Sequence, residues 1–255
     1  MNEKENSIQA NLQNHTDNEK QLFFDYGEYF KNSDLDNTQK LQAFTKYIRR
    51  QDLSRFLAKN ELFKLQLNLP GIIVECGCYA GAGTFTFGQL SAIYEPYNHT
   101  RKVVAFDTFE GFPSLAKQDK NSSRNYEKGE LFVHENIEEE IKAGISLFDR
   151  NRPLSHIPKI MLCKGDAMQS IPGYIKENPH TIVSLLYLDF DIYEPTKIAL
   201  ETFLPRMPKG SVLAFDELNA ASFPGETLAL LMTLGIKNVQ LMKTSFDSYI
   251  SYAVL

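Results

Sequence analysis

"VQLMKTSFDSYISYAVL" (residues 239–255) closes the chain and decides the class of fold. It contains two strand-like runs, 239–243 and 248–255, which are separated only by the four residues "TSFD". Four residues are too few for a crossover helix, so the two runs are expected to pair as an antiparallel hairpin. Whatever sheet precedes them must therefore end in an antiparallel strand.

Five further apolar runs alternate with helix-length segments upstream of this hairpin. They are "GIIVEC" (71–76), "KVVAFD" (102–107), "KIMLC" (159–163), "TIVSLLYLD" (181–189) and "SVLAFD" (211–216). Continuous apolar strands between helices are typical of a parallel sheet covered on both faces. We predict an α/β protein with a mostly parallel seven-stranded sheet and an antiparallel last strand. This arrangement resembles the Rossmann-like fold of methyltransferases that use S-adenosylmethionine (SAM), whereas dinucleotide-binding sheets lack the antiparallel strand.

The rest of the chain divides into three segments. Residues 1–19 are strongly polar and predict a disordered tail. Residues 20–69 show apolar positions three and four apart, which predicts N-terminal helices, and residues 70–255 form the methyltransferase domain. The segment 108–158 is too long for a simple connection, so we expect a lid-like insert that shapes the substrate site. Apolar faces on the N-terminal helices predict a homo-oligomer.

The composition excludes several classes of protein. The 255 residues are 43% hydrophobic and carry a net charge of −5, which is typical of a globular enzyme and argues against a nucleic-acid partner. The sequence holds neither a run long and apolar enough for a membrane span nor an apolar leader. Three cysteines, Cys76, Cys78 and Cys163, predict reduced thiols and a cytoplasmic location. Cys76 and Cys78 are not joined by a Cys or His pair at zinc-ligand spacing, so we read them as small buried residues.

The first candidate binding loop is "VECGCYAGAGT" (residues 74–84), where a strand ends in an acid and glycines precede a helical run. Glycines let the backbone turn tightly and let a ligand approach a helix N-terminus. The spacing Glu-x-Gly-x-x-x-Gly-x-Gly differs from the Gly-x-Gly-x-x-Gly of dinucleotide binders. A plain strand-to-helix turn is the alternative.

Two further loops supply polar groups at the next strand ends. Asp107, in "VVAFDTFEGFP", could accept hydrogen bonds from both hydroxyls of a ribose, with Thr108 and Phe109 flanking the nucleoside. Asp166, in "CKGDAMQSIP", could accept from an adenine amino group, or it could simply cap the following helix. The candidate cofactor-binding residues of the three loops are Glu75, Gly77, Tyr79, Gly81, Gly83, Thr84, Asp107, Thr108, Phe109, Gly165, Asp166 and Ala167.

Acidic residues also end the fourth and fifth predicted strands. Asp189 lies in "LLYLDFDIYEPT", and Asp216 and Glu217 lie in "VLAFDEL". Neighbouring strand ends bring these carboxylates together, and they repel one another unless they are protonated or bind a cation. Mg²⁺ and Ca²⁺ prefer oxygen ligands, so the pattern predicts a metal site. The alternative is that one acid caps a helix and the others form local hydrogen bonds.

The pieces "VECGCYAGAGT", "AFDTFEGFP", "LDFDIYEPT" and "FDEL" together resemble the macrocin O-methyltransferase-like family over residues 71–218. The resemblance implies SAM- and Mg²⁺-dependent methylation of a hydroxyl on a small molecule, most often a sugar or nucleotide sugar. It also implies that Asp189, Asp216 and Glu217 hold the metal. The family usually has Asp-Asp where this chain has Asp216-Glu217.

A mechanism follows from that resemblance. Mg²⁺ would bind two neighbouring acceptor hydroxyls and lower the pKa of the one that reacts, and Asp189 would serve as both ligand and catalytic base. The roles of Asp191 and His134 stay open. Arg49 and Arg50 could reach a phosphorylated acceptor or could be solvated helix charges. Two other functions remain alternatives: an NAD(P)-dependent oxidoreductase, opposed by the glycine spacing and the hairpin, and a non-catalytic nucleotide-binding protein.

Overall fold

The computed structural model describes residues 16–120 and 126–255, and it contains one seven-stranded sheet in the order β3-β2-β1-β4-β5-β7-β6. The first five strands run parallel, and β7 pairs antiparallel with both β5 and β6. The predicted sheet and its terminal hairpin are therefore confirmed. The strands are β1 Ile72–Cys76, β2 Val103–Asp107, β3 Ile160–Lys164, β4 Val183–Leu188, β5 Val212–Phe215, β6 Met242–Lys243 and β7 Ser251–Val254.

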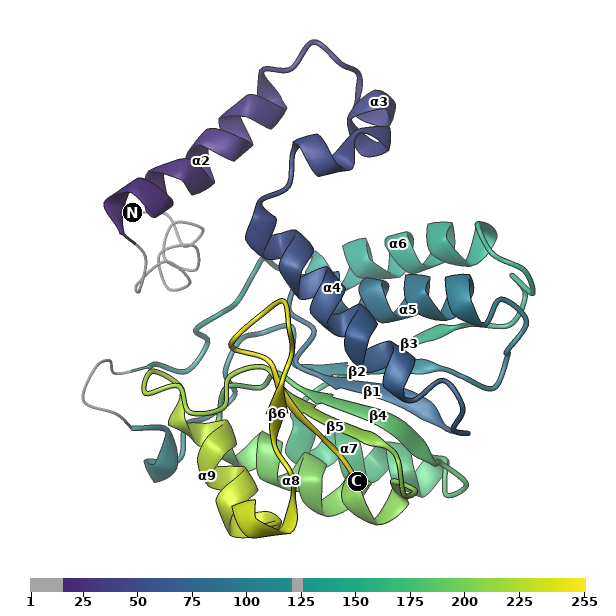
Figure 1. The fold of residues 1–255 in the computed structure, drawn as a ribbon, viewed down its shortest axis with the longest axis vertical. Coiled ribbons are helices and arrows are strands. Elements are labelled where there is room, and N and C mark those ends of the chain that lie inside the picture. The colour runs from purple at the N-terminus through teal and green to yellow at the C-terminus, as the bar shows by residue number, and fades with distance from the viewer. Residues whose placement is uncertain (1–15, 121–125) are drawn as a thin grey trace.

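Helices cover both faces of this sheet, which gives three layers (Figure 1). One face carries α4 (Arg50–Leu65), α5 (Ala82–Tyr94) and α6 (Ile137–Arg150), and the other carries α7 (Ala167–Glu177), α8 (Tyr193–Phe203) and α9 (Pro224–Thr233). Successive strand residues point to opposite faces. In β4, Tyr187 therefore packs with α4 and α5, whereas Leu186 packs with α8 and α9. Short 3-10 helices occur at Phe44–Lys46, Lys117–Asp119, Leu204–Arg206 and Ile236–Asn238.

Within the insert predicted over residues 108–158, helix α6 packs mainly on the sheet. Phe148 of α6 is buried with Phe87 and Ile160 against the sheet, and Ile137 and Ile141 pack with Phe109. Helix α6 is thus the ordinary crossover between β2 and β3, because its apolar stripe needs the sheet to cover it. The stretch before α6 and Ile137 at its start line the cavity at the strand ends, and residues 121–125 of that stretch lie outside the described residues.

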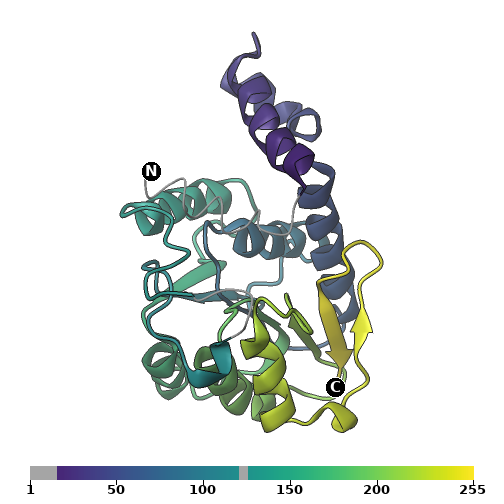
Figure 2. The same ribbon diagram turned by 90° about the vertical axis from the view of Figure 1, so that its left-hand side faces the viewer.

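The N-terminal helices α2 (Asp17–Lys31) and α3 (Asn37–Gln42) extend away from the sheet (Figure 2). The predicted boundary at residue 20 is wrong, because α2 begins at Asp17. Thr16 accepts a hydrogen bond from the backbone N–H of Glu19, and Glu19 accepts one from Thr16, which forms a capping box. The tail prediction for residues 1–15 lies outside the described residues. No described helix combines the length and the apolar character that a membrane span requires.

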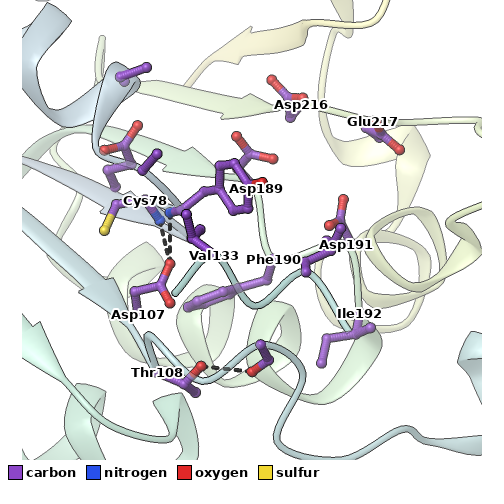
Figure 3. Close-up of a pocket in the computed structure, with 18 of the residues that line it drawn as sticks. Cys78, Asp107, Thr108, Val133, Asp189, Phe190, Asp191, Ile192, Asp216 and Glu217 are labelled. Carbon is purple, nitrogen blue, oxygen red and sulfur yellow. Dashed lines mark hydrogen bonds between the residues drawn. The ribbon is translucent and has the colours of Figure 1, made fainter. Parts of the chain in front are cut away.

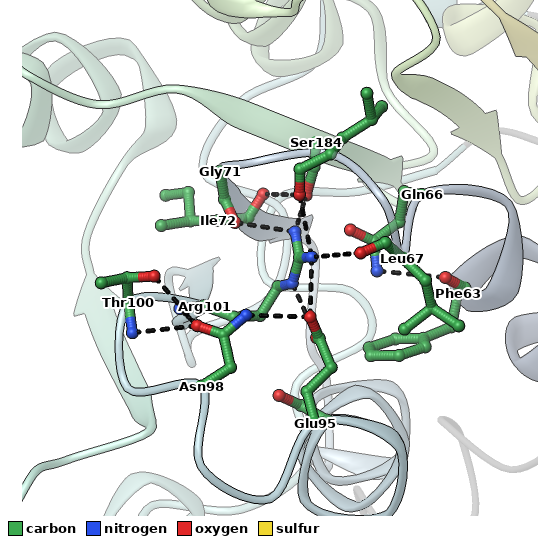
Figure 4. Close-up of polar contacts among 12 residues, drawn as sticks. Phe63, Gln66, Leu67, Gly71, Ile72, Glu95, Asn98, Thr100, Arg101 and Ser184 are labelled. Carbon is green, nitrogen blue, oxygen red and sulfur yellow. Dashed lines mark hydrogen bonds and ion pairs between the residues drawn. The ribbon is translucent and has the colours of Figure 1, made fainter.

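Arg101 lies just before β2, at the amino ends of the central strands (Figure 4). It joins the end of α5, the loop before β1 and the start of β4. Its side chain is 2% exposed and pairs with both carboxylate oxygens of Glu95, at 2.8 and 2.9 Å. It also donates to Ser184 Oγ at the start of β4 and to three backbone carbonyls, those of Leu67, Leu69 and Gly71. The loop between α4 and β1 is therefore tied to the central strands by a single guanidinium.

Candidate active site

A cavity of about 600 Å³ lies at the carboxyl ends of β1, β2, β4 and β5, close to the point where strand order reverses. Ligands of open α/β sheets bind at this position. The wall is completed by α4, by the stretch between β2 and α6, and by the loop between β5 and α9. Figure 3 shows the acids and the glycine loop converging there.

Asp107 holds two loops of the cavity in place. Its Oδ2 accepts hydrogen bonds from the backbone N–H groups of Cys78 and Tyr79, and its Oδ1 accepts one from Phe109, each at 2.8 Å (Figure 3). Tyr79 and Phe109 have φ angles of 49° and 58°, which are unfavourable for these residues. Asp107 thus stabilises two strained turns, and its predicted contact with a ribose would use the acceptor capacity that remains.

Most of the predicted cofactor residues lie on the cavity wall. Those that line it are Glu75, Gly77, Tyr79, Gly83, Asp107, Thr108, Phe109, Gly165 and Ala167. The structure gives the other three local structural roles. Gly81 precedes α5 with φ 85°, Thr84 donates to Glu75 from a buried position, and Asp166 caps α7 by accepting from the Met168 N–H at 3.0 Å. For Asp166 the capping alternative is what the structure shows.

Gly77 lies where β1 and β4 separate, and its φ of 89° requires a residue without a side chain. A Cβ at this position would overlap the backbone carbonyl oxygen of Asp189. We expect Gly77→Ala to lower the free energy of unfolding by at least about 2 kcal/mol, because it combines a disfavoured φ with a backbone clash. Urea denaturation measures this. Gly173→Ala in α7 is the matched control, because nothing lies within 4 Å of a Cβ at that position. This control should be neutral or stabilising. Equal stabilities of the two variants would contradict the prediction.

Four carboxylates gather at the ends of β4 and β5: Asp189, Asp191, Asp216 and Glu217 (Figure 3). Asp216 is 3% exposed and accepts hydrogen bonds from Arg55 and from the hydroxyl of Tyr187. Burial alone would raise the pKa of Asp216, but the charges of Arg55 and Lys59 outweigh it and lower that pKa. Asp216 is therefore the ionised, paired member of the cluster.

For the other three carboxylates, burial and neighbouring negative charge outweigh the positive charges nearby. Burial, reinforced by Asp216, raises the pKa of Asp189 well above its usual range and that of Glu217 to about 7. Burial, reinforced by Glu217 and Asp189, raises the pKa of Asp191 in the same way. Asp191 also has a φ of 63°, so the chain does turn at this residue. The cluster holds more negative charge than its neighbours balance.

The cluster fits a cation in charge but not in the present positions of its side chains. Glu217 Oε2 is buried without a hydrogen-bond partner, and uncompensated carboxylates are the ligands that Mg²⁺ prefers. Across residues 16–120 and 126–255, however, no three His, Cys, Asp or Glu side chains stand close enough to hold a metal ion. The predicted ligands thus line the wall without forming a ready-made metal site, and Asp216 is engaged by Arg55 and Tyr187.

Sequence reasoning missed Glu226, which holds both acidic strand ends. This buried residue in the first turn of α9 accepts backbone N–H bonds from Phe190 and Asp191 on one oxygen and from Glu217 on the other. It also missed Arg55, Lys59 and Tyr187. The four-residue spacing of Arg55 and Lys59 on a predicted helix is a signal for a shared face; for Glu226 the sequence carries no specific signal.

Of three residues whose roles the sequence left open, His134, Arg49 and Arg50, one lines the cavity. His134 lies 3.3 Å from Glu140 and Arg50 is exposed, and neither lines the cavity. Arg49 does line it, but it is paired with Asp52 at 2.7 Å. Cys76 and Cys78 are buried free thiols, as predicted. One wall is aromatic: Tyr126 stacks on Phe223 at 4.7 Å and meets Phe112 edge-on.

Comparison with known proteins places this chain in a family. The sequence profile of macrocin O-methyltransferase (TylF) matches residues 9–228. The chain belongs to the macrocin O-methyltransferase family. This confirms the resemblance inferred from the motifs and the enzyme class to which it points, the SAM-dependent O-methyltransferases.

Individual known proteins resemble the chain to different extents. The crystal structure of CalS11, a calicheamicin methyltransferase, matches with a TM-score of 0.90 and 31% identity, over 94% of this chain and 93% of that one. The apo structure of CalS11, described as a TDP-rhamnose 3'-O-methyltransferase, matches with a TM-score of 0.81 and 29% identity, over 94% and 95% of the two chains.

A curated relative from Streptomyces olivaceus, 8-demethyl-8-(2,3-dimethoxy-alpha-L-rhamnosyl)-tetracenomycin-C 4'-O-methyltransferase, is 27% identical over 154 residues. That match spans 58% of this chain and only about half, 53%, of the relative. The O-methyltransferase NovP shares the fold, with a TM-score of 0.56 at 17% identity over 79% of each chain.

Proposed function

We propose that this protein transfers the methyl group of SAM to a hydroxyl of a small sugar or nucleotide sugar, with Mg²⁺ as a second cofactor. The observation that carries the proposal is the cavity itself, in which the glycine loop and Asp107 lie beside the carboxylates of β4 and β5. The relatives that act on TDP-rhamnose and on a rhamnosyl group support a sugar acceptor. A cytoplasmic location stays a prediction.

The two halves of the cavity suit the two substrates. SAM would lie against the glycine loop, with its ribose toward Asp107 and its adenine toward Gly165 and Ala167. The acceptor would lie between the carboxylates and the aromatic wall of Phe112, Tyr126 and Phe223, since sugar rings pack their C–H faces on aromatic rings. The reacting hydroxyl would then point at the methyl group.

A neutral alcohol is a poor nucleophile, so a base must take its proton. Asp189 is our candidate, because its carboxylate lines the cavity beside the proposed place of the acceptor hydroxyl. Asp191 is the second candidate, because it lines the same cavity.

Asp189, Asp216 and Glu217 would hold Mg²⁺. The bound ion would act as a Lewis acid that lowers the pKa of the acceptor hydroxyl and helps to orient it. The negative charge that surrounds Glu217 supports this assignment. In this chain, the longer arm of Glu217 would reach the ion where the family usually offers a second aspartate.

The decisive experiment measures methyl transfer from radiolabelled SAM to TDP-rhamnose. We expect EDTA to lower the rate roughly 100-fold, because the acceptor hydroxyl loses its Lewis acid, and added Mg²⁺ to restore it. Full turnover in EDTA would remove the metal from the function. Calorimetry with SAM and with NAD tests the fold-level alternative, since binding of NAD and not of SAM would overturn the proposal.

We expect SAM to bind more weakly at lower pH because of Glu75. It lies buried on the cavity wall, and burial, opposed by Lys59, raises its pKa to about 7. Above that pH it is ionised and attracts the cationic SAM, so affinity should fall roughly tenfold from pH 8 to pH 6 as Glu75 takes up a proton. Calorimetry should show that Glu75→Gln loses this extra dependence, whereas Glu139→Gln, on the exposed face of α6, keeps it. Identical pH profiles of wild type and Glu75→Gln would contradict the prediction, because SAM's own amino group titrates equally in both.

A further inference from the structure

Helix α4 supplies all the cationic side chains that line the described wall of the cavity: Arg49 at its start, Arg55 and Lys59. Asp52, Arg55, Phe56 and Lys59 line the wall together, and their spacing of three, four and seven residues puts them on one helical face. The anionic wall comes from the strand ends. An element outside the predicted methyltransferase domain thus provides the counter-charges of its site.

Arg55 bridges two carboxylates from different parts of the fold. One guanidinium nitrogen, Nη2, donates to Asp216 at the end of β5, and Nη1 lies 3.8 Å from Asp247 in the turn between β6 and β7. The side chain of Arg55 is 36% exposed, whereas those of Asp216 and Asp247 are 4% and 13% exposed. Arg55 is therefore the most exposed member of this group, and its two partners are more deeply buried.

Lys59 does not share that freedom. It is 5% exposed, donates to the Tyr187 hydroxyl at 3.0 Å and lies 4.2 Å from the centre of the Tyr187 ring. Tyr187 in turn donates to Asp216 Oδ1, the same oxygen that Arg55 contacts. Of the two cations near Asp216, Arg55 is the more exposed and the one in direct contact with the carboxylate.

We propose that Arg55 is an exchangeable counter-ion, which neutralises Asp216 in the metal-free protein and moves to Asp247 when a divalent cation binds Asp216. The inference rests on the metal site proposed above. Asp216 already accepts from Arg55 and Tyr187 on Oδ1, and a divalent cation placed beside the guanidinium would add like-charge repulsion, so the two cations compete for this buried carboxylate. Asp247 is already within reach, so Arg55 would not be left unpaired.

The exchange links metal binding to a helix outside the strand ends. Arg55 of α4 contacts the carboxylate that the metal would use. Because Arg55 and the metal compete for one group, each weakens the binding of the other by the same factor. Metal affinity is then set by α4 and by the β6–β7 turn, as well as by the ligands themselves.

The test measures Mg²⁺ affinity of the EDTA-treated, SAM-free full chain by calorimetry at pH 8, together with the rise of Tm on adding Mg²⁺. Arg55→Met should bind Mg²⁺ roughly tenfold more tightly and show a larger rise of Tm, because the competitor is gone. Arg50→Met, an exposed arginine on the same helix, should match wild type. Asp247→Asn should bind Mg²⁺ more weakly, because Arg55 then has no second carboxylate, and the double variant Arg55→Met/Asp247→Asn should equal Arg55→Met alone.

Each outcome decides between the two proposals. If wild type binds Mg²⁺ and Arg55→Met binds it no more tightly, the exchange is overturned and the metal site stands. If neither binds Mg²⁺, the metal site and the exchange both fail. Should Arg55→Met not fold, Asp247→Asn, which leaves the ligands and Arg55 in place, carries the test, and unchanged Mg²⁺ affinity in that variant overturns the exchange.

Discussion

Asp189→Asn should lower the rate of methyl transfer roughly 10³-fold and leave the dissociation constant of SAM within about twofold of wild type. The substitution keeps the shape of the side chain but removes the charge that accepts a proton and would bind the metal. SAM binding should survive, because the residues proposed to hold SAM belong to the β1, β2 and β3 loops and not to the end of β4.

The stability of Asp189→Asn shows whether the role of Asp189 is chemical or structural. Asp189 lies among carboxylates that raise its pKa, so neutralising it should relieve repulsion and leave Tm unchanged or higher. Single-turnover kinetics, calorimetry with SAM and a thermal melt measure the three quantities. Asp34→Asn, an exposed residue remote from the cavity wall, serves as the neutral control.

Asp191→Asn distinguishes the two candidate bases. If Asp189 is the base, Asp191→Asn should retain most of the activity, and Asp189→Asn should stay inactive at every Mg²⁺ concentration. Retained turnover in Asp189→Asn would show that Asp189 is neither base nor required ligand. A larger loss in Asp191→Asn than in Asp189→Asn would move the base to the turn residue.

Arg101→Met should destabilise the fold by about 3–5 kcal/mol, the usual cost of removing one partner of a buried ion pair. It removes the guanidinium donors of the carbonyls of Leu69 and Gly71, and it leaves the Glu95 carboxylate with only the Asn98 amide as a donor (Figure 4). For a chain of this size we expect Tm to fall by roughly 10 °C or more. Buried unpaired polar groups, rather than lost apolar packing, cause the loss, since Met fills similar space.

Urea denaturation and a thermal melt check this prediction. Arg150→Met, an exposed arginine at the end of α6, is the matched control and should change the free energy of unfolding by less than about 0.5 kcal/mol. If Arg101→Met also lost less than about 0.5 kcal/mol, water would be replacing the guanidinium in the variant. The network would then contribute specificity of loop conformation and little stability.

The sequence alone determined the sheet, its antiparallel hairpin and the position of the site. These features follow from local patterns: apolar runs of strand length, a four-residue connection and polar residues at strand ends. Asp107, Asp189, Asp216 and Glu217 could be placed on the cavity wall because parallel strands end at one edge of the sheet, whatever their side chains do next.

Only the tertiary structure decided how these residues are used. Asp166 caps a helix, α6 packs mainly on the sheet and reaches the cavity only with Ile137, and Glu226 ties two acidic turns together from a third element. Arg55 and Asp216 are 161 residues apart in the chain, and no local pattern relates them. Charge pairing across such distances depends on how α4 packs on the sheet, because electrostatic energy is set by separation and burial in space and not by position in the sequence.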